Sequence, residues 1–185
     1  MLRLKEFVLE RSILLEFPRA YIHYLVHFHG DRDYFECHEI LEKYWKTSDP
    51  GNRSSVWVGL IQLAVAQYHY RRGNEKGAKK LIEKSTKILH QNTSVLEKLG
   101  LNAPVILDLL INLKTIYVNG QLYKEVNLPI TNQQLMNICK SECFSLGFQW
   151  CSKEDLNNNF LIHRHLFQDR DSVRVLPHTT EKLYV

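Results

Sequence analysis

The feature that most constrains the fold is a run without charged residues from Ser54 to Tyr70. It contains VWVGLIQLAVAQYHY, whose apolar residues would face every side of a helix. Such a helix has to be covered by neighbouring helices, and the run falls short of the ~20 residues that a bilayer span needs. We therefore predict a central buried helix from Val56 to Tyr70 and no membrane segment.

Two amphipathic segments flank this run. The first, DYFECHEILEKYW from Asp33 to Trp45, places its apolar residues on one arc of a helix, and Asp33 with Glu36 resembles a capping box. The second, from Ala78 to Leu89, has an apolar stripe at spacings of three and four opposite a face of lysines. Both helices are expected to pack on the central one.

The chain changes character after Gly120. Before it, helices are also predicted from Pro18 to about Phe28 and from Asn102 to about Asn119. After it, a short helix through Lys140 is predicted, while FLIHRH (160–165) and VRVL (173–176) could be short strands. We therefore predict an all-α fold, with a helical bundle over residues 1–120 and an irregular C-terminal appendage over 121–185 that could contain short strands.

Composition argues against several classes of function. The net charge of +4 is dispersed among acidic residues, so no nucleic-acid partner is expected. The four cysteines are too few and too irregularly spaced for a disulfide framework. The start of the chain is interrupted by Glu6, Glu10 and Arg11, and so lacks the continuous apolar core of a secretory signal. We expect a cytoplasmic protein, with a helix near its start and no cofactor.

Polar residues within the apolar arcs are the candidate functional residues. His38 and Glu42 lie one helical turn apart inside the arc of the first amphipathic segment, and Gln62 and His69 share a face of the central helix. Arg71 lies on another side of that helix. Because a buried carboxylate without partners is very costly, we predict that Glu42 is largely buried and bonded to one of the other four residues.

The run HEILEKYW, followed by GLIQLAVAQYHYRRGNEKGAKKL, resembles the bacterial domain-of-unknown-function family 309. The family pattern is H-E-x-L-E-x-x-W, then G-L-I-Q, then Y-H and G-N-x-x-G-A, with a signature core over about residues 28–92. The resemblance implies an all-helical bundle in a longer, Bacillus-type member, and it implies no reaction. One departure is Arg32, where the family usually has a glycine before the acidic cap. The signature positions are His38, Glu39, Glu42, Trp45, Gly59, Gln62, His69, Asn74, Gly77 and Ala78.

The polar cluster has two interpretations. One is a buried structural network in a non-catalytic interaction or binding module; the other is a metal-dependent hydrolase using His38, Glu42 and His69. The chain has neither H-E-x-x-H nor the E-x-x-H of di-iron bundles, so no metal is assigned. We favour the module, with a protein partner or self-association. Its expected site is His38, Glu39, Glu42, Gln62, His69 and Arg71.

Overall fold

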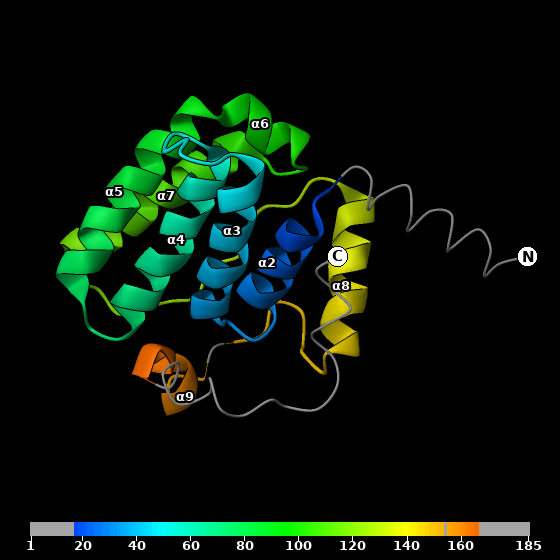
Figure 1. Ribbon diagram of the computed structural model, residues 1–185. Coiled ribbons are helices and arrows are strands. Elements are labelled where there is room, and N and C mark those ends of the chain that lie inside the picture. Colours follow the sequence, from blue (N-terminus) through cyan, green and yellow to red (C-terminus); the bar gives the residue numbers. More distant parts are fainter. Residues whose placement is uncertain (1–16, 154, 167–185) are drawn as a thin grey trace, which may run out of the picture.

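The computed structural model describes residues 17–153 and 155–166, so the predicted first helix and the VRVL segment lie outside it. Within these residues every regular element is helical, apart from one isolated bridge between Leu101 and Ile130 (Figure 1). The prediction of an all-α fold is confirmed. The elements are α2 (Arg19–His29), α3 (Tyr34–Ser48), α4 (Val56–Arg71), α5 (Glu75–Gln91), α6 (Thr93–Lys98), α7 (Ala103–Val118), α8 (Gln133–Ser145), α9 (Asn159–Ile162) and a 3-10 turn (Arg164–Leu166).

The longer helices contact one another in the order α7, α5, α4, α3, α2, α8. Figure 1 shows α5, α4, α3, α2 and α8 side by side, with α7 behind α5 and α4. As predicted, α4 is central, with α3 on one side and α5 on the other. The close approach of α5 requires Gly59, because a Cβ at that position would lie 2.5 Å from Cδ2 of Leu89. The Ser85 hydroxyl of α5 donates to the Gly59 carbonyl over 2.8 Å, which fixes the crossing of the two helices.

Asparagine and aspartate side chains begin most of these helices. Asp33 Oδ1 accepts from the Glu36 amide at 3.0 Å, which confirms half of the predicted capping box. In the other half, the Asp33 amide donates to Asp31 Oδ1 rather than to Glu36. Asn102 caps α7 as predicted, and Asn132 caps α8.

The chain after Gly120 returns across the bundle. The Leu128 amide donates to Nε2 of buried His29 over 2.8 Å, and α8 then packs against α2. FLIHRH is helical, so the expectation of a strand there is wrong. The physical reason is local capping: the Asn158 side chain accepts from the Leu161 amide and starts the single turn of α9.

Arg32 holds this returning segment in place. Its backbone has a φ of 60°, the left-handed conformation that favours glycine, and its side chain is only 1% exposed. All five guanidinium N–H groups donate. Their acceptors are Phe28 O, Val126 O, Asn127 Oδ1 and Ser152 O, the last of which accepts two bonds, at distances from 2.8 to 3.1 Å.

In the part of the chain that the structure describes, no helix combines the length and the apolar character needed to cross a bilayer.

Candidate functional site

The predicted polar cluster begins with three side chains on α3. His38 Nδ1 lies 3.0 Å from Glu39 Oε1, and its Nε2 lies 3.6 Å from Glu42 Oε2. Lys46 Nζ lies 3.3 Å from the same Glu42 oxygen. Because 3.6 Å is too long for a hydrogen bond, His38 and Glu42 form a loose ion pair at most.

These side chains are not buried. His38, Glu39 and Glu42 are 28%, 38% and 34% exposed, so the prediction that Glu42 is largely buried is wrong. The reason is the packing of α3, which buries Tyr34, Cys37, Ile40 and Leu41. His38 and Glu42 therefore lie at the edge of the apolar arc rather than at its centre.

One donor atom from each of these three residues lies within 4.8 Å of the others, which is close enough to hold a metal ion. Exposed acidic groups of this kind are common without a metal, and Lys46 already supplies a positive charge to Glu42. His69 does not join this group among the described residues. The structure therefore does not form the metal set of His38, Glu42 and His69 considered above.

His69 instead belongs to a group at the end of α4. Its Nδ1 lies 3.0 Å from the Arg72 guanidinium and 2.9 Å from the Asn74 amide nitrogen, so Nδ1 is the hydrogen-bond acceptor of the ring. Burial, and then the charges of Arg72 and His165, lower the pKa of His69. Its imidazole is therefore neutral near pH ~7.

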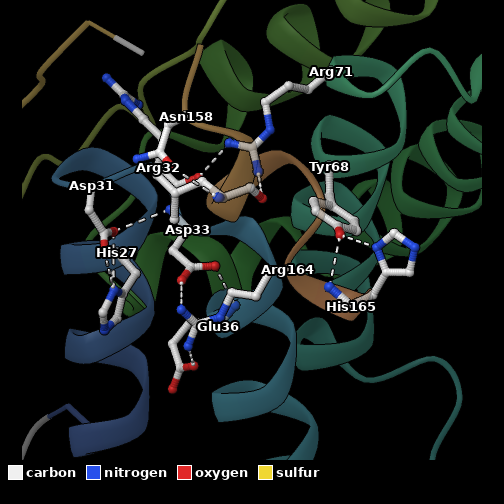
Figure 2. Close-up of polar contacts among 11 residues, drawn as sticks. His27, Asp31, Arg32, Asp33, Glu36, Tyr68, Arg71, Asn158, Arg164 and His165 are labelled. Atoms are coloured by element: carbon white, nitrogen blue, oxygen red, sulfur yellow. Dashed lines mark hydrogen bonds and ion pairs between the residues drawn. The ribbon is translucent and has the colours of Figure 1, made fainter. Parts of the chain in front are cut away.

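His38 and His69 meet at a hollow of about 220 Å³, the histidine hollow. His165, from the 3-10 turn after α9, joins them there: its Nδ1 lies 2.6 Å from the Tyr68 hydroxyl (Figure 2) and its Nε2 lies 3.0 Å from Arg72. Sequence reasoning missed His165, because no local pattern links it to α4, and it missed Arg72 although Arg72 follows His69 by only three residues. The hollow is lined by Tyr34, Phe35, His38, Val65, Tyr68, His69, Arg72 and His165.

Gln62 lines a second and larger hollow of about 450 Å³, the basic hollow. Its floor is α4, and its walls come from α3 and α5. The Oε1 atom of Gln62 is buried and has no hydrogen-bond partner among the described residues. The polar and aromatic residues that line the basic hollow are Glu42, Trp45, Arg53, Ser54, Gln62, Lys84, Lys87 and Gln91.

Arg71 lines neither hollow. Its NH1 donates to the Arg32 carbonyl and its NH2 to the Leu161 carbonyl, each over 2.9 Å, and its guanidinium lies 5.1 Å from the centre of the Tyr34 ring. The candidate site predicted from the sequence is thus divided: His38, Glu39 and Glu42 stay together, His69 and Gln62 line separate hollows, and Arg71 stabilises the packing of α9.

A polar network that includes one buried carboxylate, Asp33, lies around the start of α3. Figure 2 shows Arg164 reaching Asp33 and Glu36, with nitrogen-to-oxygen distances of 2.8 and 2.9 Å. Burial raises the pKa of the Asp33 carboxyl, although the Arg164 charge opposes this shift. Together with Arg71, these contacts hold the short α9 segment against the ends of α3 and α4.

The fold and the signature residues agree with the comparisons with known proteins. A family model, Domain of unknown function (DUF309), matches residues 21–81. The chain belongs to this family, as HEILEKYW predicted. It is 45% identical over 157 residues to the uncharacterized protein YpuF of Bacillus subtilis (strain 168), an alignment that covers 85% of this chain and 90% of YpuF. No solved structure matches the chain significantly.

Proposed function

We propose that the protein is a cytoplasmic helical interaction module without catalysis of its own, which receives a protein partner or a second copy on the α3–α4 face. The observation that carries this proposal is the exposure of His38, Glu39 and Glu42 beside the two hollows. Ion pairs at such exposure contribute only ~0–1 kcal/mol to stability, so a structural role does not account for them. Polar groups placed around an apolar hollow, such as the histidine hollow, are typical of binding sites.

The geometry gives less support to a metal-dependent hydrolase. A metal at His69 Nδ1 would have to displace the Arg72 guanidinium and lie beside its positive charge. Elemental analysis of the protein purified without an affinity tag tests this point. Stoichiometric metal that disappears when His38 is replaced by glutamine would favour the hydrolase over the module.

The module is tested by photo-crosslinking from the α3–α4 face in Bacillus subtilis cells. A photoreactive phenylalanine analogue at position 39 should give a defined adduct, because the Glu39 side chain is exposed beside the histidine hollow. The matched control places the analogue at Asp108, an exposed position on α7, which contributes no residue to either hollow. An adduct of twice the chain mass would identify self-association, and any other defined mass a protein partner.

The His38→Gln variant completes the test. It should retain the stability of the parent protein and lose the adduct from position 39. If no adduct forms, or if positions 39 and 108 give the same adducts, the α3–α4 face is not the interaction surface.

A further inference from the structure

The basic hollow has a charge that the described residues do not balance. Arg53, Lys84 and Lys87 line it with exposed side chains, and none of them forms an ion pair within the described residues. The one carboxylate that lines it, Glu42, already lies 3.3 Å from Lys46 Nζ. Within the part of the chain that the structure describes, three positive charges are thus left without a carboxylate partner and could bind an anion.

The rest of the hollow is suited to the body of an organic ligand. Trp45 lies on one wall, with its orientation fixed by a 3.0 Å hydrogen bond from its Nε1 to the Asn52 carbonyl. The floor combines Val58 and Ile61 with Gln62, whose buried Oε1 has no hydrogen-bond donor among the residues that the structure describes. An unpaired buried acceptor is costly, and a ligand N–H or O–H group would remove that cost.

We propose that the basic hollow binds a small phosphorylated molecule with a flat body and a hydrogen-bond donor, which is the chemistry of a nucleoside phosphate. The phosphate groups pair with Arg53, Lys84 and Lys87, the flat body packs on Trp45, and the donor bonds to Gln62 Oε1. The volume of about 450 Å³ lies in the range of ~300–1,000 Å³ that is usual for small-molecule sites.

A small molecule fits this hollow better than an acidic peptide. Trp45 gives the hollow a flat aromatic surface on which a ring can pack, and an acidic peptide has no ring to place there. The inference goes beyond the proposed interaction module, because it requires no protein partner.

Isothermal titration calorimetry of the full chain tests the proposal with ADP and UDP as nucleotide probes, and with adenosine, uridine and pyrophosphate as their parts. At least one nucleotide should bind, and its nucleoside and pyrophosphate should each bind at least about tenfold more weakly. The affinity should also fall as salt is added, because exposed charges are screened.

Charge-reversal variants locate the site. The K84E and K87E variants should each weaken nucleotide binding about tenfold, the change that ~1.4 kcal/mol produces. The matched control is K98E, which makes the same change at an exposed lysine on α6 that does not line the hollow.

The Gln62→Met variant separates a ligand contact from a structural role. It removes the unpaired acceptor at similar size, so the protein should be as stable as the parent or more stable, while nucleotide affinity falls and pyrophosphate affinity does not. The proposal is overturned if neither nucleotide binds, if pyrophosphate binds as tightly as the nucleotide, if K98E weakens binding as much as K84E, or if a poly-glutamate peptide binds more tightly than either nucleotide.

Discussion

Replacing Gln67 with methionine should make the protein more stable. Gln67 lies on the central helix α4 and is 0% exposed, and neither Oε1 nor Nε2 of its side chain has a hydrogen-bond partner among the described residues. An amide buried in this way costs about 1–3 kcal/mol. Methionine has a similar length and no group to satisfy, and imperfect packing of such a swap costs less than ~1.5 kcal/mol. We therefore expect the free energy of unfolding to rise by about 1 kcal/mol.

Urea unfolding followed by circular dichroism measures this change directly. The midpoint should rise with an unchanged slope, and Tm should rise by about 2–4 °C per kcal/mol for a chain of this size. Gln134→Met is the control, because Gln134 is exposed on α8 and its replacement should change stability by less than ~0.5 kcal/mol. A loss of stability in Gln67→Met would show that the amide is hydrogen-bonded in solution and would refute the reasoning.

Three further perturbations test other parts of the structure. Burial, followed by the charge of Arg32, lowers the pKa of His29 to about 3. As the pH falls below ~6.5, this histidine therefore takes up a proton in the unfolded chain but not in the folded protein. That difference alone lowers the free energy of unfolding by about 1.4 kcal/mol per pH unit. His29→Gln should therefore lose less stability than the parent between about pH 7 and about pH 5, measured by urea midpoints; equal losses would contradict the assignment. Glu42→Ala should cost less than ~1 kcal/mol in the same assay, since its side chain is 34% exposed; a larger cost would restore a structural role for the pair with His38. Arg32→Lys keeps the charge but has three donors in place of five, so it should lower the free energy of unfolding by about 1–3 kcal/mol. An unchanged free energy of unfolding would mean that the positive charge alone holds the returning segment in place.

The helices were predictable where the local pattern was strong. The uncharged run predicted α4 and its central position, and Asp33 predicted the start of α3 through its short-range hydrogen bond to Glu36. The helical conformation of FLIHRH was not predictable from periodicity, because α9 is a single turn. It depends on Asn158 and on a contact with Arg71, a residue distant in sequence.

The candidate site was predicted only in part, because helical spacing gives the direction of a side chain and not the centre of the buried face. Helical spacing correctly predicted that His38 and Glu42 lie on the same side of α3. Which residues of that side are buried depends on packing against both α2 and α4, and this places Cys37 and Leu41 at the centre. Arg72 follows His69 by three residues, so helical spacing could have predicted this contact, whereas the distant His165 could not be predicted in this way.

The conformation of Arg32 has a consequence for the descent of the family. A left-handed backbone costs an arginine about 1–2 kcal/mol relative to glycine, and the cost is offset here by bonds to residues 126, 127 and 152. In a relative whose chain ends before this segment, the same arginine would lose most of its acceptors, and glycine would be favoured. Arginine at this position and the segment after Gly120 should therefore have been gained and lost together. The single residue before the acidic cap should then reveal, from sequence alone, which members of the family carry the returning segment.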